Sequence, residues 1–144
     1  MIYRMSAALL SLAGLFISAY LYLYKLGRIG SLACGTGGCE RVQLSSWSRF
    51  AGIEVSFIGL LGYAALLVLS LMSLQLPERA WPVRMMLWAA LVGVGFTLYL
   101  TYLEVFVIHA ICRWCIASGV IILSIFAVSY LGQRSVRRQS SRRA

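Results

Sequence analysis

The sequence has little charge and very little proline. Only 12% of its 144 residues are charged and 61% are hydrophobic, whereas about 25% of the residues in a soluble domain carry a charge. These proportions exclude the water-soluble enzyme classes and indicate a membrane protein. Two prolines exclude a proline-rich linker, and thirteen glycines are ordinary usage that excludes collagen-like or low-complexity chains.

The net charge of +9 does not indicate a nucleic-acid-binding protein, because much of the positive charge lies at one end of the chain. Five of the thirteen basic residues fall in the last eleven positions, directly after an apolar run: Arg134, Arg137, Arg138, Arg142 and Arg143. Such a tail is typical of a membrane-orientation signal.

Four apolar runs are long enough to cross a bilayer, whose core of about 30 Å requires about 20 helical residues. They cover residues 5–24, 55–76, 85–108 and 112–131. We therefore expect an all-α membrane protein: a four-transmembrane-helix bundle over residues 1–132, then a basic cytoplasmic tail over residues 133–144. The first run exceeds the core of a signal peptide, about 7–15 residues, so we expect it to be retained as a helix.

Four crossings place both termini on one side of the membrane. Eight of the lysines and arginines fall on the side of the termini and five on the other, so the positive-inside rule places the termini in the cytoplasm. Residues 25–54 then form an extracytoplasmic loop. We expect a multi-pass protein of a bacterial inner membrane whose active site faces the periplasm.

The four cysteines form two closely spaced pairs, both on the expected outer side. Cys34 and Cys39 flank a glycine-rich spacer, and Cys112 and Cys115 form a C-x-x-C at the start of the fourth span. Disulfides persist in this oxidising compartment, and two pairs at one boundary suggest an electron relay. Because glycine restricts the chain little, we expect the first pair to be a mobile shuttle that meets a soluble partner.

The position of the second pair favours reactivity. In the first turn of a helix, the macrodipole and the free N–H groups favour a thiolate, and Arg113 adds a neighbouring positive charge. Residues three apart lie on one face of a helix, and the second of them lies deeper along the helix axis. We therefore expect Cys115 to face the bilayer and Cys112 to face the loop. Two alternatives stay open for a non-catalytic membrane protein: structural disulfides, or a four-cysteine site for zinc or an iron–sulfur cluster. The half-buried second pair disfavours the metal site, and we predict no metal ligands.

Several segments resemble the vitamin K epoxide reductase family, in its bacterial, disulfide-forming branch. They are Cys34, the run 39–47, the run 57–63 that begins the second span, and the Cys112-Arg113-Trp114-Cys115 motif. The resemblance extends over essentially the whole chain. It implies an enzyme, a quinone-dependent thiol–disulfide oxidoreductase built as a four-helix bundle around ubiquinone or menaquinone. Its redox partner would be a separate DsbA-like protein with a thioredoxin fold, and the two proteins together would support disulfide bond formation.

The same resemblance implies roles for individual residues. Cys115 would lie next to the quinone with Cys112 as its resolving partner, while Cys39 would exchange with Cys112 and Cys34 would meet the substrate. Ser45 corresponds to the serine or threonine that the family has near its active site.

Two positions that would contact the quinone depart from the pattern of the vertebrate members. Those members hold the naphthoquinone with an asparagine at the start of the second span and a tyrosine four residues after the second cysteine of the C-x-x-C. Here Val55 and Gly119 occupy these places. The departure favours plain quinone reduction over epoxide reduction.

Three polar residues near the second pair are candidates for supporting roles. Glu104 is the only acidic residue well inside a span, and such residues are functional candidates by default. It is a candidate to relay protons to the quinone, but its place near the interface favours a carboxylate that snorkels to the interface or pairs with Arg113. His109 is a candidate to tune the Cys112 thiolate, although a lone interfacial histidine is more often merely solvated.

The run after Cys39 alternates apolar and polar residues. Val42, Trp47 and Phe50 lie among arginines, serines and a glutamine. This pattern predicts a short amphipathic helix that lies on the membrane between the first two spans as a lid.

Overall fold

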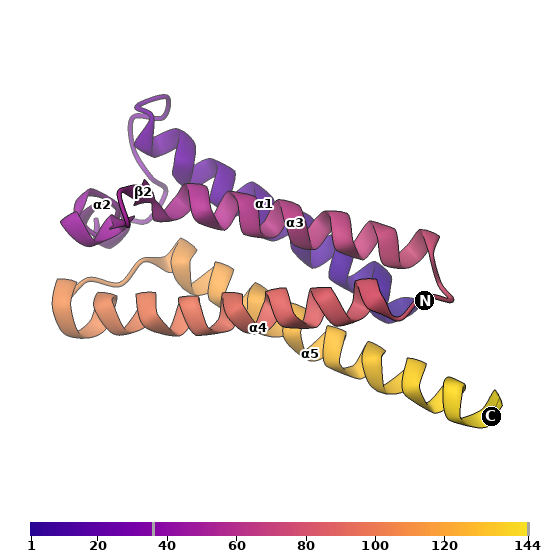
Figure 1. The fold of residues 1–144 in the computed structure, drawn as a ribbon. Helices are drawn as coiled ribbons and strands as arrows, with labels where there is room; N and C mark the ends of the chain where they lie inside the picture. Colours follow the sequence, from indigo (N-terminus) through magenta and orange to yellow (C-terminus); the bar gives the residue numbers. More distant parts are fainter. Residues whose placement is uncertain (36, 144) are drawn as a thin grey trace.

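The computed structural model describes residues 1–35 and 37–143, and four long helices dominate it (Figure 1). These are α1 (Ile2–Lys25), α3 (Val55–Gln75), α4 (Trp81–Tyr102) and α5 (Arg113–Arg143). A π-helical segment, η2 (Leu103–Ile108), extends α4. All four are long and apolar enough to cross a membrane, which confirms the expected all-α bundle. Thr36 of the glycine-rich spacer and Ala144 of the tail lie outside the described residues.

The helices extend beyond the predicted spans at several ends. α4 begins at Trp81 instead of residue 85, because Pro82 suits the first turn of a helix. α5 continues through the arginine-rich tail to Arg143, so the described part of the predicted tail is an extension of the last helix. The apolar runs marked the thickness of the membrane and not the ends of the helices.

The helices form a ring in which each packs against two neighbours. α1 packs against α3 and α5, and α4 closes the ring by packing against the same two helices. Both termini lie at one end of the bundle, while the α1–α3 loop and the α4–α5 connection lie at the other (Figure 1). The two segments that carry the cysteine pairs therefore share one end.

Small residues allow the helices to approach closely, as expected in a membrane bundle. A Cβ at Gly14 would overlap the Tyr63 ring, and one at Gly93 would lie 2.9 Å from Ile122 Cγ1. Gly62 and Gly95 do not serve such an approach, because a Cβ at either position would meet nothing within 4 Å.

Several polar groups inside the bundle bond to nearby backbone carbonyls, whereas the Ser56 and Ser129 hydroxyls have no partner among the described residues. Ser11 and Ser73 are buried, and each donates a hydrogen bond of 2.7 Å to a carbonyl of its own helix. Arg4 at the start of α1 donates to the carbonyls of Ser73 and, at 3.1 Å, Pro77, at the far end of α3. In a bilayer such pairing is required, since no water is present to bond an exposed polar group. Large apolar side chains cover the outside instead, among them Leu9, Phe16, Val68, Leu98 and Leu123.

The outer loop folds into a helix and a hairpin. α2 (Gly38–Leu44) is followed by the single turn η1 (Ser46–Ser48) and the antiparallel strands β1 (Arg49–Phe50) and β2 (Ile53–Glu54). The predicted amphipathic helix was wrong in extent, because Ser45 adopts an extended conformation that ends α2. Trp47 and Phe50 therefore lie in η1 and the hairpin. Ala51 and Gly52 both have positive φ, as a two-residue hairpin turn of this type requires.

Candidate active site

The two cysteine pairs converge at the end of the bundle opposite the termini. Cys34, Cys39 and Cys112 are 2%, 0% and 0% exposed and form one buried cluster with neighbouring apolar side chains, against which Cys115 packs. Gly38 makes the approach possible, since a Cβ there would lie 2.5 Å from the carbonyl oxygen of Ile111. The spacer glycine at this position thus serves close contact between α2 and the segment before α5, a role that its mobility alone does not explain.

The two pairs differ in how their sulfur atoms are placed. Cys34 and Cys39 form a disulfide, whereas Cys112 and Cys115 are free thiols.

Cys112 occupies the position just before α5 instead of lying in its first turn. Its carbonyl accepts a hydrogen bond from the Ile116 N–H at 3.0 Å, and its Sγ accepts one from the Cys115 N–H at 3.3 Å. The sulfur thus acts as a helix N-cap, a position where the free N–H groups favour negative charge. Cys115 lies further along the helix, with its side chain on the side of the membrane interior.

Glu104 lies in the π-helical segment and faces the cysteines. Its side chain is buried, and its Oε2 accepts a hydrogen bond from the Cys112 N–H at 3.2 Å. The expectation that Glu104 snorkels to the interface or pairs with Arg113 was wrong: Glu104 is buried, Arg113 is exposed, and no ion pair joins the two among the described residues. The backbone N–H of Cys112 at the start of α5 bonds the carboxylate in place of the Arg113 side chain.

His109 ends the π-helical segment. Its backbone adopts a left-handed conformation with φ 54°, and its N–H donates to the Glu104 carbonyl. The imidazole is exposed, and no hydrogen bond connects it to Cys112 within the described residues. The position of His109 agrees with a solvated side chain that shapes the turn before Cys112.

A cavity of about 710 Å³ opens between the helices below the cysteines. Its walls are largely apolar and come from all four long helices, and Cys115, Glu104 and Gln43 lie among the lining residues. Protein sites for small organic ligands typically have about 300–1,000 Å³. The volume and lining therefore suit a flat aromatic ring with an apolar tail.

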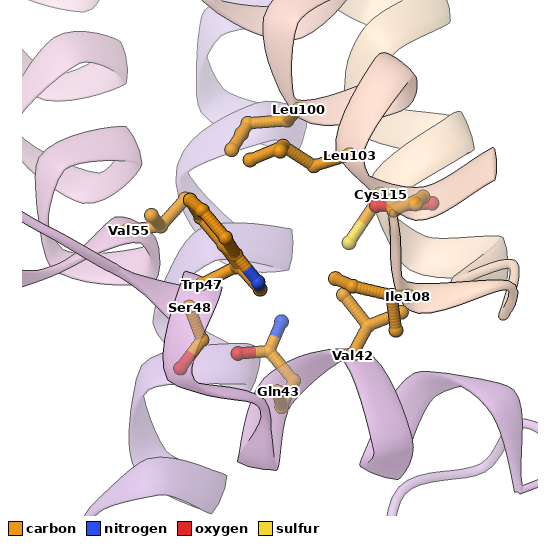
Figure 2. Close-up of a pocket in the computed structure, with 10 residues that line it drawn as sticks. Val42, Gln43, Trp47, Ser48, Val55, Leu100, Leu103, Ile108 and Cys115 are labelled. Carbon is orange, nitrogen blue, oxygen red and sulfur yellow. The ribbon is translucent and has the colours of Figure 1, made fainter. Parts of the chain in front are cut away.

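A small cavity of about 40 Å³ adjoins the large one under the outer loop. Figure 2 shows the Cys115 sulfur pointing into it, with Gln43 rising from α2 and Trp47 on the opposite side. Val55, Leu100, Glu104, Gln43 and Cys115 line both cavities. Of the four cysteines, Cys115 alone contributes to these two linings.

The family model for the vitamin K epoxide reductase family matches residues 5–130 of the chain. The chain belongs to this family. Membership in the vitamin K epoxide reductase family makes the protein a multi-pass membrane oxidoreductase of a quinone-associated group.

The remaining family-based site residues differ in their relation to the cavities. Val55 at the start of α3 lines both. Gly119 is absent from both linings as described and packs against α4, where a Cβ would lie 3.0 Å from Thr97 Cγ2. Ser45 lies at the end of α2 and donates from its hydroxyl to the Val42 carbonyl at 2.8 Å. The family's serine position thus stabilises the fold of the loop above the site.

Sequence reasoning missed Gln43, which is 6% exposed. The signal was present: Cys39, Val42 and Gln43 have the i, i+3, i+4 spacing of one helix face, and all three are buried. Phe50 was expected in the lid, but its aromatic contacts with Phe96 and Tyr99 of α4 join segments far apart in the sequence, and no local pattern predicts them.

A polar clamp fixes the lid, formed by η1 and the hairpin, to the end of α1. Lys25 Nζ lies 3.0 Å from Glu54 Oε2 and donates to Ser48 Oγ at 2.7 Å. Arg49 Nε donates to Glu54 Oε1 at 2.9 Å. Partial burial by itself raises the pKa of the Glu54 carboxyl, but the bonds from Lys25 and Arg49 outweigh it and hold that pKa below its ordinary value. Glu54 is therefore ionised in the folded protein at neutral pH.

The clamp makes the stability of the lid depend on pH. Because the pKa of Glu54 is lowered by folding, its stabilisation is present above the ordinary value of 4.5 and is lost as the pH falls below that value through the lowered one. We expect Glu54→Gln to reduce the free energy of unfolding at pH 7 by less than about 1 kcal/mol, and by a smaller amount at pH 3. Thermal unfolding in detergent at both pH values measures this. Glu78→Gln, at the opposite end of the bundle, is the control, and a constant difference between Glu54→Gln and wild type at all pH values would contradict the clamp.

Proposed function

We propose that this member of the vitamin K epoxide reductase family is a membrane thiol oxidase. It would pass electrons from a soluble dithiol through Cys34 and Cys39, then through Cys112 and Cys115, to a bound quinone. The observation that supports this proposal is the different placement of the four cysteines. Three share a buried cluster in which the pairs can exchange, and Cys115 alone faces the cavity.

The exchange between the pairs balances as an ordinary thiol–disulfide reaction. A partner dithiol reduces the Cys34–Cys39 disulfide and is itself oxidised. The Cys39 thiolate then attacks Cys112 Sγ in a Cys112–Cys115 disulfide, and Cys115 leaves as a thiolate. Cys34 closes on Cys39 and releases Cys112, so two electrons move inward.

The residues around the large cavity fit a quinone, which when bound supplies an acceptor for two electrons and two protons. The apolar walls suit an isoprenoid tail, and Cys115, Glu104 and Gln43 gather at one end, where a polar headgroup would lie. Glu104 contacts both inner cysteines, so its carboxylate is positioned to take up a thiol proton. The lid covers this end and limits access of water.

Orientation and partner follow from charge and chemistry. The excess of basic residues at the end with the termini supports cytoplasmic termini in a bacterial inner membrane, with the cysteines on the periplasmic side. The partner would be a separate DsbA-like protein with a thioredoxin fold. A periplasmic oxidant of about −120 mV is kept oxidised through a quinone route and not by a thiol buffer. The quinone would be ubiquinone or menaquinone.

Replacement of Cys115 tests the exchange. In Cys115→Ser the Cys112 thiolate can attack Cys39 and release Cys34, but no thiol at position 115 can then displace Cys39. A Cys39–Cys112 disulfide should therefore accumulate and be found by mass spectrometry of peptides from unreduced protein. Cys112→Ser is the control and cannot form this bridge. If Cys115→Ser contains only the Cys34–Cys39 disulfide, the pairs do not communicate.

Orientation is tested by reporters that are active in one compartment only. A reporter fused after Ala144 or inserted at Glu78 should behave as cytoplasmic, and one inserted near Gly37 as periplasmic. The reverse pattern would contradict both the compartment and the direction of electron flow.

The substrate preference is tested with purified protein and a chemical dithiol. Val55 and Gly119 lack the side-chain donors that hold the naphthoquinone in vertebrate members, and removal of one donor for a developing oxyanion costs about 2.7–4 kcal/mol. We expect quinone reduction to be at least about a hundredfold faster than reduction of the corresponding epoxide, and both to be lost in Cys115→Ser. Comparable rates would require a different arrangement of donors in the cavity.

A further inference from the structure

Gln43 is a buried amide that faces the cavities without a protein partner. Its side chain is 6% exposed and contributes to the lining of both cavities. Figure 2 shows it rising from α2 toward the space between Trp47 and Cys115. No hydrogen bond to the amide is present among the described residues. A buried amide in this state loses hydrogen-bond energy unless another molecule completes it.

Two of the other polar side chains around the small cavity are already engaged. Ser48 Oγ accepts a hydrogen bond from Lys25, and Glu104 Oε2 accepts one from the Cys112 N–H. In the large cavity, the Tyr63 hydroxyl donates to the Ser118 carbonyl at 2.8 Å. The Ser56 hydroxyl has no partner, but its oxygen is covered by protein atoms and does not reach the cavity space. Gln43 is therefore the buried side chain with free donors at the end of the cavity that holds Cys115, and the indole N–H of the half-exposed Trp47 is a second donor without a partner among the described residues.

We propose that the Gln43 amide donates a hydrogen bond to a carbonyl oxygen of the quinone and so orients its headgroup against Cys115. The inference rests on the proposed quinone function and names the residue that takes over from the donors absent at positions 55 and 119. Gln43 is a positioning residue of the outer loop, on the same helix face as Cys39. The helix that carries the loop disulfide thus also forms the roof over the headgroup.

An amide suits this place better than a charged group. It has two N–H donors and a carbonyl acceptor, so it can bond the carbonyl of the oxidised form and the hydroxyl of the reduced form. A lysine or arginine would donate only. A neutral amide also adds no charge beside Glu104 and the inner cysteines.

Infrared difference spectroscopy tests the hydrogen bond in the wild-type protein itself. The probes are a ubiquinone and a menaquinone with one isoprenoid unit, each carrying 13C at a carbonyl carbon and bound in nanodiscs. A hydrogen bond weakens the C=O bond, so one carbonyl band should lie at a lower frequency than in an apolar solvent. In Gln43→Met, which keeps the length of the side chain, this band should return toward the solvent value. The dissociation constant, measured by quenching of tryptophan fluorescence, should rise about tenfold, or about 1.4 kcal/mol.

Controls separate this inference from the function on which it rests. Gln75→Leu replaces an exposed glutamine at the far end of α3 and should change neither band nor affinity. If the wild type binds neither probe, the quinone function itself is wrong. If the wild type binds a probe but shows no shifted carbonyl band, or if Gln43→Met keeps the shifted band, Gln43 is not the donor and the quinone function stands. If Gln43→Met fails to fold, Gln43→Leu is measured in its place, and a shifted band that persists in it contradicts the inference.

Discussion

The contact between the start of α2 and the segment before α5 is the constraint on which the site depends. Gly38 lies so close to the Ile111 carbonyl that a Cβ would not fit, and this approach buries Cys39 and Cys112 in one cluster. Thiol–disulfide exchange requires sulfur atoms to meet. Because the two segments are separated by more than half of the chain, only closure of the four-helix ring can bring them to the same place.

Around this contact, the outer loop serves as a roof and as a redox element. α2 carries Cys39 and Gln43, so any movement of the loop that exposes the buried disulfide to a partner also moves the amide above the cavity. The clamp of Lys25, Glu54 and Arg49 holds the other part of the loop to α1 and α3. The loop therefore has two parts. The clamp fixes the part that contains the hairpin, and the other part contains the glycine-rich spacer and α2.

Glu104 links the fold to the chemistry. The π-helical turn places a buried carboxylate where it caps the backbone N–H of Cys112 and lines the cavity with Cys115. Irregular turns of this kind often occur at functional sites in helices. A regular α-helix would direct the residue at position 104 differently, so the local irregularity determines which side chain meets the thiols.

The sequence by itself determined the four membrane helices, the shared end of the two cysteine pairs and the family, because apolar run length, charge asymmetry and cysteine spacing are local properties of the chain. It also predicted Cys115 as the cysteine deepest in the membrane. Only the tertiary structure decided that Glu104 caps Cys112 instead of pairing with Arg113, that Gly119 packs against α4 outside the described cavity linings, and that Gln43 faces the cavity. These outcomes depend on which groups come closest once the helices pack. Contacts between segments far apart in the sequence produce no local pattern from which they could be predicted.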